Sequence, residues 1–136
     1  MHVDDTAARA SHYDYAVIRV VPRVEREEFV NVGVILSCEA SRYLDARIEL
    51  DEARVLALSP ALDIDSLRRH LQAIPAICHG GADAGPIGLL PQRARFHWLT
   101  ARRSSIIQTS PVHTGKCDDM PAIMEHLLQR MVRVAR

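Results

Sequence analysis

The polar side chains that could take part in chemistry are densest in one segment, residues 100–117. In it, two adjacent arginines are followed by serines, and a polar loop with a histidine and a threonine comes next. Guanidinium groups and hydroxyls can together hold a phosphate or a carboxylate. We therefore predict an anion site or a charged contact with a protein partner, with a strand flanked by ordinary polar turns as the alternative. The candidate residues are Arg102, Arg103, Ser104, Ser110, His113 and Thr114.

Three further candidates lie on the first two predicted strands. Asn31 and Gly33 interrupt an otherwise apolar strand, where either residue is unusual. A glycine in a strand marks a bulge or a close approach of another backbone segment. Asn31 either faces a ligand or ties down a neighbouring element. Arg19 lies in an apolar strand and needs a partner there.

No residue spacing in the chain predicts a metal site or a cofactor site, and we expect neither. His113 and Cys117 are four residues apart, and Cys78 is next to His79, but neither arrangement is a recognised set of zinc ligands. The phosphate-binding P-loop and the GxSxG motif of serine hydrolases are absent as well. One enzyme hypothesis stays open. In it, the arginine pair positions a phosphate-bearing or nucleotide-like substrate and His113 acts as the acid or base.

Composition and charge limit the kinds of partner. The chain has 136 residues, 48% of them apolar, with 17 basic and 17 acidic side chains, which is typical of one ordinary globular domain. Residues 1–65 carry 13 acidic and 7 basic side chains, whereas residues 66–136 carry 4 acidic and 10 basic ones. The basic half can attract an anion. Net neutrality and an aromatic content of 4% argue against nucleic acid as the partner, and no apolar stretch predicts a membrane span.

The first half of the chain predicts three consecutive strands with short connections, which form an antiparallel meander. The strands cover residues 15–21, 30–37 and 43–50. In the second strand, strict alternation directs Val30, Val32, Val34 and Leu36 to one face and the intervening side chains to the other. In the third strand, apolar and polar side chains alternate cleanly, so one face belongs to the core.

A change of period after residue 50 predicts helices. A short helix covers residues 51–58. A longer amphipathic helix begins after Asp63 or Asp65, either of which can cap its N-terminus. Pro75 should kink or end this helix, because proline has no N–H to donate.

The last third of the chain predicts a short helix, one more strand and a closing helix. The short helix opens at Pro91, the strand covers residues 104–110, a polar loop covers residues 110–116, and the closing helix begins at Asp118 or Asp119. This order indicates an α+β domain. We expect a mainly antiparallel sheet of about four strands, the N-terminal meander plus one later strand, with helices packed on one face.

The chain divides into a short lead-in and one domain. We assign residues 1–12 to a disordered N-terminal lead-in and residues 13–136 to a single α+β domain. The lead-in lacks the basic and apolar regions of a secretory signal. The three cysteines are widely spaced and include no CxxC pair, which fits reduced thiols in a reducing compartment. A cytoplasmic location is therefore expected.

Three segments resemble a known bacterial family. They are YAVIRVVP, EFVNVGVIL and RFHWLTARRSSIIQTSPVHTG, and the match rests most on FVNVGV at residues 29–34 and on the third segment. From Tyr13 to Val134 the chain is similar to the domain of unknown function DUF3037, a family of uncharacterised small proteins. The resemblance implies a small cytosolic bacterial protein and transfers no catalytic residue. It also implies a HipA-like serine/threonine kinase as a partner, because genes of the family often stand beside genes for such kinases.

The sequence therefore favours a non-enzymatic binding or accessory module over an enzyme. Its expected contact surface combines Arg19, Asn31 and Gly33 with the segment 102–114, and its expected ligand is a protein partner or a small anion. The oligomeric state is left open. One pocket shared by the arginines, Asn31 and His113 would favour a small ligand or a substrate, whereas scattered positions on a flat apolar surface would favour a protein partner.

Overall fold

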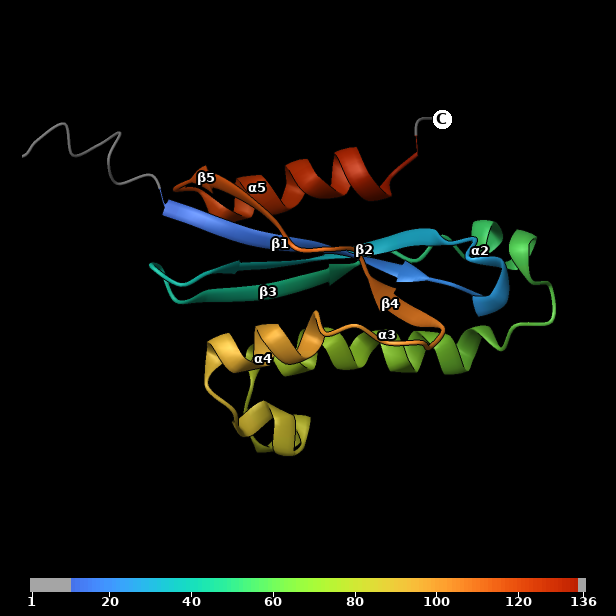
Figure 1. Ribbon diagram of the computed structural model, residues 1–136, viewed down its shortest axis with the longest axis horizontal. Coiled ribbons are helices and arrows are strands. Elements are labelled where there is room, and N and C mark those ends of the chain that lie inside the picture. The colour runs from blue at the N-terminus through green and yellow to red at the C-terminus, as the bar shows by residue number, and fades with distance from the viewer. Residues whose placement is uncertain (1–10, 135–136) are drawn as a thin grey trace, which may run out of the picture.

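The computed structural model describes residues 11–134, which form an antiparallel sheet packed between helices (Figure 1). The strands are β1 (Ser11–Val20), β2 (Val30–Cys38), β3 (Tyr43–Ile48), β4 (Ile107–Thr109) and β5 (His113–Cys117). The helices are α2 (Glu52–Leu58), α3 (Ile64–His79), α4 (Gln92–Leu99) and α5 (Met120–Leu127). Short helical turns are η1 (Val24–Arg26), η2 (Ala82–Ala84), η3 (Pro86–Leu89) and the π-helical η4 (Leu128–Val132). The predicted α+β class is confirmed.

The strand β1 lies at the centre of the sheet. The strand order is β3-β2-β1-β4, and β5 also pairs with β1. Every pairing is antiparallel, and β4 and β5 follow each other along the same side of β1. The predicted N-terminal meander is therefore confirmed. The polar loop expected at residues 110–116 is wrong, because residues 113–117 pair with β1 as β5.

Ser110 explains why the strand beside β1 is split in two. Its N–H donates to the carbonyl of Val17 at 2.8 Å, but its hydroxyl accepts the N–H of Val17, also at 2.8 Å. The same hydroxyl donates to the carbonyl of Pro111 at 2.9 Å. A side chain thus replaces one carbonyl of the ladder, and pairing resumes at His113, beyond a proline that has no N–H.

A β-bulge in β2 overturns the strict alternation expected for this strand. Ile18 pairs with Gly33 but Arg19 pairs with Asn31, so Val32 is an extra residue on β2. The extra residue reverses which side chains face each side of the sheet. The valines before the bulge therefore enter one core, and the apolar side chains at alternate positions after it enter the other.

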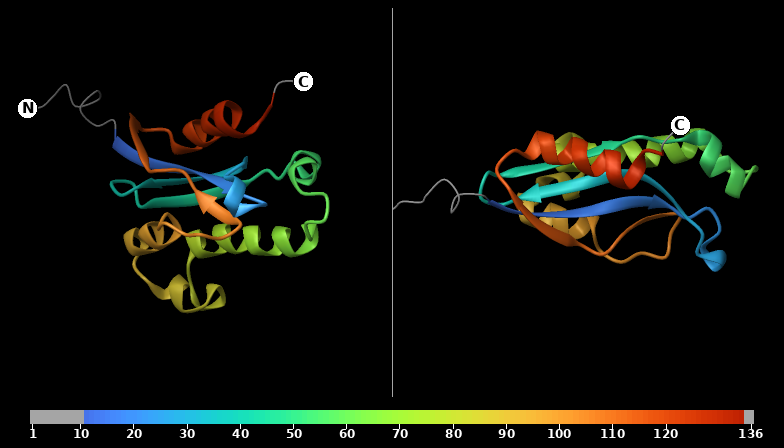
Figure 2. Two further views of the ribbon diagram at one scale, coloured as in Figure 1. Left: turned by 45° about the vertical axis from the view of Figure 1, so that its right-hand side comes forward. Right: turned by 90° about the horizontal axis from the view of Figure 1, so that it is seen from above.

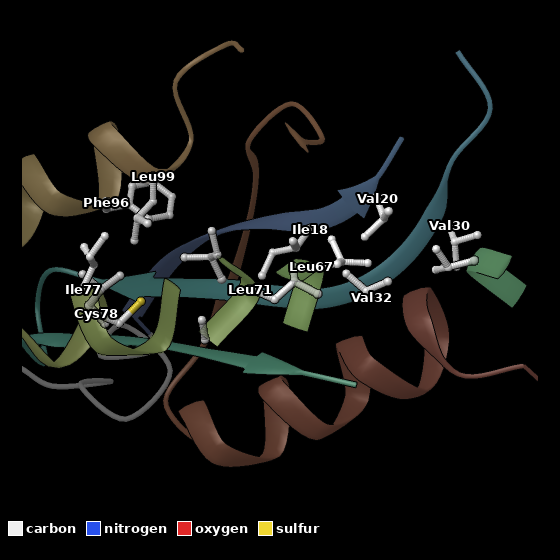
Figure 3. Close-up of a cluster of buried hydrophobic side chains, with 14 residues drawn as sticks. Ile18, Val20, Val30, Val32, Leu67, Leu71, Ile77, Cys78, Phe96 and Leu99 are labelled. Atoms are coloured by element: carbon white, nitrogen blue, oxygen red, sulfur yellow. The ribbon is translucent and has the colours of Figure 1, made fainter. Parts of the chain in front are cut away.

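Helices cover both faces of the sheet, so the expectation of helices on one face needs correction (Figures 1 and 2). One core joins Val30 and Val32 to buried side chains of α2, α3 and α4 (Figure 3). The other core joins Val34 and Leu36 to α5 and η4. The sequence of β2 is apolar almost throughout, which is typical of a strand covered on both faces.

The predicted helix starts agree with the structure. Asp51, Asp63 and Asp119 each accept an N–H from the first turn of the helix that follows, which satisfies one of the unpaired donors at a helix N-terminus. Pro91 directly precedes α4. Local sequence signals therefore set where these four helices begin.

Of the two alternatives predicted for Pro75, the helix end is wrong, because α3 continues through this residue to His79. Proline removes one hydrogen bond from a helix interior. The residues beyond it bury apolar surface in return, since Ile77 and Cys78 lie in the core beneath the sheet. Gly80 ends the helix at a φ of 79°, a backbone conformation that favours glycine.

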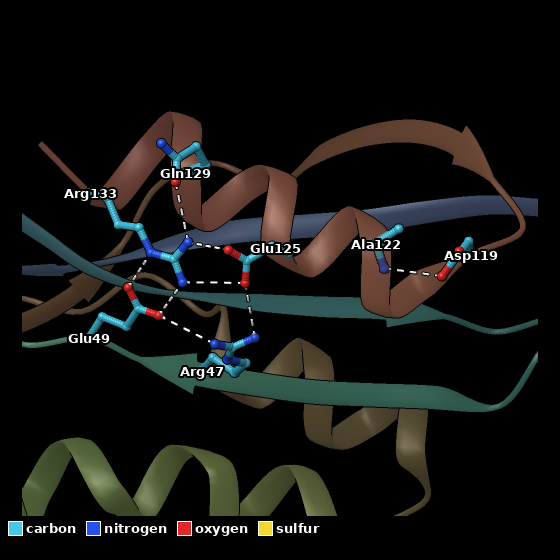
Figure 4. A network of polar contacts seen from close by, with 7 residues as sticks. All are labelled: Arg47, Glu49, Asp119, Ala122, Glu125, Gln129 and Arg133. Carbon is cyan, nitrogen blue, oxygen red and sulfur yellow. Dashed lines mark hydrogen bonds and ion pairs between the residues drawn. The ribbon is translucent and has the colours of Figure 1, made fainter. Parts of the chain in front are cut away.

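An ion-pair network ties the C-terminal helix to the edge of the sheet (Figure 4). Arg133 donates to both carboxylate oxygens of Glu49 at 2.7 Å and also pairs with Glu125. Arg47 of β3 lies 3.4 Å from Glu49 and 3.5 Å from Glu125. Hydrogen bonds from Arg133 lower the pKa of both carboxyl groups and raise the pKa of Arg133 itself. The network holds the end of the chain against β3.

The described chain starts close to the expected domain boundary. β1 begins at Ser11, two residues before the expected start at Tyr13. The rest of the predicted lead-in, residues 1–10, lies outside the described residues. Within residues 11–134, no helix is both long enough and apolar enough to cross a membrane.

Candidate functional site

The segment before β4 and the turn at η1 reach the same end of the sheet (Figure 2). Residues of both segments line a polar hollow. It encloses about 650 Å³ and is lined by residues 100–104, residues 108–111, Arg19 and Glu27. We call it the Arg19 hollow. Its lining carries three arginines and one glutamate, so its net charge is positive. The sequence candidates that line it are Arg19, Arg102, Arg103, Ser104 and Ser110.

Arg19 is the most deeply placed cation of this hollow. It lies on β1, is partly buried, and pairs in register with Asn31 of β2 and Gln108 of β4. Its guanidinium carbon lies 4.2 Å from the centroid of the Phe29 ring, a cation–π distance. Its Nε is buried without a hydrogen-bond partner. The terminal nitrogens of this guanidinium are not buried, so an anion beside them could form the charge-assisted hydrogen bonds that Arg19 lacks within the described residues.

Comparison with the other arginines makes Arg19 exceptional. The other partly buried arginines among residues 11–134 each donate to a carboxylate or to a backbone carbonyl. They are Arg54, Arg93, Arg95, Arg103 and Arg133. Within the same residues, Arg19 has neither kind of partner.

Arg102 adds a second guanidinium without a partner. It is exposed and lines the Arg19 hollow, and in the described part of the chain it makes no ion pair and no hydrogen bond. Ser104, two residues on, is exposed and lines the hollow too. Thr109 also lines the hollow and contributes its backbone N–H group. Because Ser110 bonds to β1, the N–H of Thr109 points the opposite way, as alternate residues of a strand do. Together these groups could hold an oxyanion.

Arg103 combines a charge with a structural role. Its guanidinium donates to the carbonyls of Trp98 at 2.5 Å, Leu99 at 3.2 Å and Ala101 at 3.4 Å. It also lies 4.4 Å from the centroid of the Trp98 ring. Carbonyls at a helix C-terminus have no partner within the helix. Arg103 satisfies them at the end of α4 and thereby fixes the loop that presents Arg102.

Asn31 and Gly33 do not line the Arg19 hollow. The Nδ2 group of Asn31 donates to the carbonyl of Met131 in η4 at 2.9 Å, so it ties the C-terminal turn to β2. Its Oδ1 is buried without a partner. Gly33 lies at the bulge, where an added Cβ would be 2.5 Å from the carbonyl oxygen of Arg47. Both residues thus have a structural explanation that the sequence raised as an alternative.

His113 and Thr114 also lie outside the hollow. Both are exposed on β5. The ring of His113 lies 5.4 Å, centroid to centroid, from the ring of Tyr15 on the neighbouring strand. The structure therefore gathers the arginines and serines of the predicted set into one hollow and leaves the histidine apart from them.

The strands and the loop that build the hollow lie within the part of the chain that a family profile matches. The profile described as "Protein of unknown function (DUF3037)" covers residues 15–132. The chain belongs to the DUF3037 family. A comparison with curated proteins finds no match, and a comparison with solved structures finds none either. Membership of DUF3037 carries no activity, so any function must be argued from the site.

Besides Thr100, Ala101, Thr109 and Pro111, three residues of this DUF3037 site were not sequence candidates. Glu27 lines the hollow from the turn after η1, Gln108 lines it from β4, and Phe29 supports Arg19. Phe29 is 44% exposed although it directly precedes a buried strand. An exposed aromatic beside an arginine-bearing strand was the available signal. Nothing in the spacing places residues 27–29 opposite a loop about seventy residues later.

Within residues 11–134, no group of three or more His, Cys, Asp or Glu is arranged to hold a metal ion. Cys78, a residue of α3 next to His79, lies in the core, and burial raises the pKa of its thiol to about 12. This thiol is therefore not a reactive group at neutral pH.

Proposed function

We propose that this DUF3037 protein is a binding module that holds an anionic group, a phosphate or a carboxylate, in the Arg19 hollow. The observation that carries the proposal is the guanidinium of Arg19, which is partly buried and leaves Nε without a partner. The unpaired guanidinium of Arg102 lines the same hollow. An anion that meets both would gain charge-assisted hydrogen bonds.

The acidic residue of the hollow does not neutralise these arginines. Glu27 lines the hollow, but among the described residues it forms no ion pair. Elsewhere, arginines such as Arg93 and Arg133 are engaged by carboxylates at 2.7 Å. The excess positive charge around the Arg19 hollow is therefore available to a ligand.

No specific observation favours the enzyme alternative. That hypothesis needed His113 beside the arginine pair as an acid or base, and His113 lies on β5 outside the hollow. A binding role requires only the cations and donors that line the hollow. It is therefore the function that the geometry supports best.

A calorimetric titration with inorganic phosphate and with citrate tests the proposed function. The wild-type protein is expected to bind at least one of the two anions, and Arg102→Gln is expected to bind it about tenfold more weakly, because one charge-assisted contact is lost. Arg69→Gln is the matched control, since Arg69 is also exposed, is unpaired within the described chain and lies outside the hollow. Equal affinities for wild type and Arg102→Gln would contradict the proposal.

The source of the anion inside the cell is part of the same proposal. We propose a protein partner such as a HipA-like kinase, supported by the sequence resemblance, and a cytoplasmic location, supported by the cysteine pattern. The three cysteines form no disulfide. A partner protein that binds wild type and the Arg69→Gln control but not Arg102→Gln would be the source of the anionic group that the hollow holds.

A further inference from the structure

A second hollow continues the Arg19 hollow on the side of the η1 turn. It encloses about 410 Å³ and shares five lining residues with the first: Arg19, Glu27, Arg103, Ser104 and Gln108. Its remaining lining includes Val21, Val24 and Phe29. We call it the Phe29 hollow. The two hollows form one surface that carries the arginines at one end and the apolar side chains of Val24 and Phe29, beside Glu25 and Glu27, at the other.

The apolar end of this surface is open to solvent. Val24 is 39% exposed and Phe29 is 44% exposed. Trp98 lines neither hollow, but its ring stacks with the guanidinium of Arg103, which lines both, and it is 41% exposed. Exposed aromatic rings stacked with arginines are typical of the residues that dominate protein–protein binding. The composition therefore indicates a contact with a polypeptide as well as with an isolated charge.

We propose that the ligand is a segment of another polypeptide in which an acidic side chain is adjacent to a bulky apolar one. The proposal rests on the proposed function, because the acidic side chain occupies the Arg19 hollow beside Arg102. The apolar side chain packs in the neighbouring hollow against Val24 and Phe29. Burying it there removes apolar surface of both molecules from water, which adds to the affinity of the carboxylate alone.

Charge distinguishes this ligand from a nucleic acid. Glu25 and Glu27 both line the Phe29 hollow, so a chain of phosphates that crossed from one hollow to the other would meet two carboxylates. A polypeptide brings one acidic group to the arginines and neutral atoms to the apolar end. Its backbone N–H groups can also donate to the carboxylate of Glu27, which is unpaired among residues 11–134. A peptide therefore complements both ends.

Fluorescence anisotropy with two labelled synthetic peptides tests this inference. The first peptide is acetyl-GGDFGG-amide, and the second, acetyl-GGDSGG-amide, has the same single charge but no bulky side chain. The first is expected to bind the wild-type protein at least about tenfold more tightly than the second. Phe29→Ser and Val24→Ser should each reduce this ratio, and Arg102→Gln should weaken both peptides. Val134→Ser is the control, because Val134 is 42% exposed and lines neither hollow.

The outcomes separate this inference from the proposed function. Equal binding of the two peptides, with phosphate or citrate still bound in an Arg102-dependent way, would overturn the polypeptide ligand and leave the anion site in place. A single-stranded oligonucleotide that displaces the first peptide at a lower concentration than the unlabelled peptide does would overturn it in favour of nucleic acid. Absence of binding by the peptides, phosphate and citrate together would overturn both proposals.

Discussion

Replacing Gly33 by alanine is expected to destabilise the protein by about 3 kcal/mol, the upper part of the usual range for overpacking a core. The added Cβ would lie 2.5 Å from the carbonyl oxygen of Arg47, and the side chains of Ile18 and Ile48 would both be at 3.1 Å. The carbonyl belongs to the neighbouring strand, so the clash can be relieved only if the backbone of β2 or β3 moves. Urea unfolding followed by circular dichroism measures the loss.

Gly115→Ala is the matched control for this prediction. An alanine Cβ at Gly115 would meet the ring of Tyr13, a side chain that can turn away, on a strand at the edge of the sheet. We expect a clearly smaller loss of unfolding free energy for Gly115→Ala than for Gly33→Ala. Wild-type stability in Gly33→Ala would show that the bulge does not need glycine.

Ser110→Ala is expected to lower the free energy of unfolding by about 2 kcal/mol. The substitution removes the hydroxyl that accepts the N–H of Val17 and leaves this buried donor without a partner. It also removes the hydrogen bond to the carbonyl of Pro111. The amide hydrogen of Val17 should also exchange with deuterium faster, because the side-chain hydrogen bond that protects it at the junction of β4 and β5 is lost.

Ser104→Ala controls for the loss of a serine hydroxyl from the same hollow. Ser104 is exposed, and among the described residues its hydroxyl makes no hydrogen bond. Its replacement should change stability by less than about 0.5 kcal/mol. Equal stabilities of Ser110→Ala and Ser104→Ala would contradict the role assigned to Ser110.

Local signals made much of the fold predictable. Asp63, one of the two residues predicted to cap α3, does cap it, and α2 and α5 begin after Asp51 and Asp119, close to their predicted starts. The alternation in β3 correctly assigns Leu44 and Ala46 to the core. The bulge in β2 was not predictable in position, because alternation on either side of Val32 looks continuous in the sequence. The run of apolar residues in β2 indicated that helices cover both faces of the sheet, but the strict alternation that we expected for this strand favoured one covered face.

The sequence indicated which types of residue the candidate site contains, but not how they are arranged in space. The basic, hydroxyl-rich segment does contribute Arg102 and Ser104 to the hollow, and Arg19 joins them because β1 lies beside β4. In the sequence, His113 was as good a site candidate as the serines near the arginine pair. In the structure, pairing is interrupted at Ser110, and His113 lies on the next strand, β5, outside the hollow. Phe29 was not predicted as a site residue, because its contact with Arg19 depends on the turn between β1 and β2.

The most direct test of the account is to locate the bound anion on the protein by NMR. Residue-resolved spectra would be recorded while inorganic phosphate is added, with sodium chloride of equal ionic strength as the reference. We predict that the largest shifts occur at the side-chain Nε–H of Arg19 and at the backbone amides of Ser104 and Thr109. Shifts equal to those in sodium chloride, or shifts centred on the exposed Arg69 and Arg130, would contradict an anion site in the Arg19 hollow.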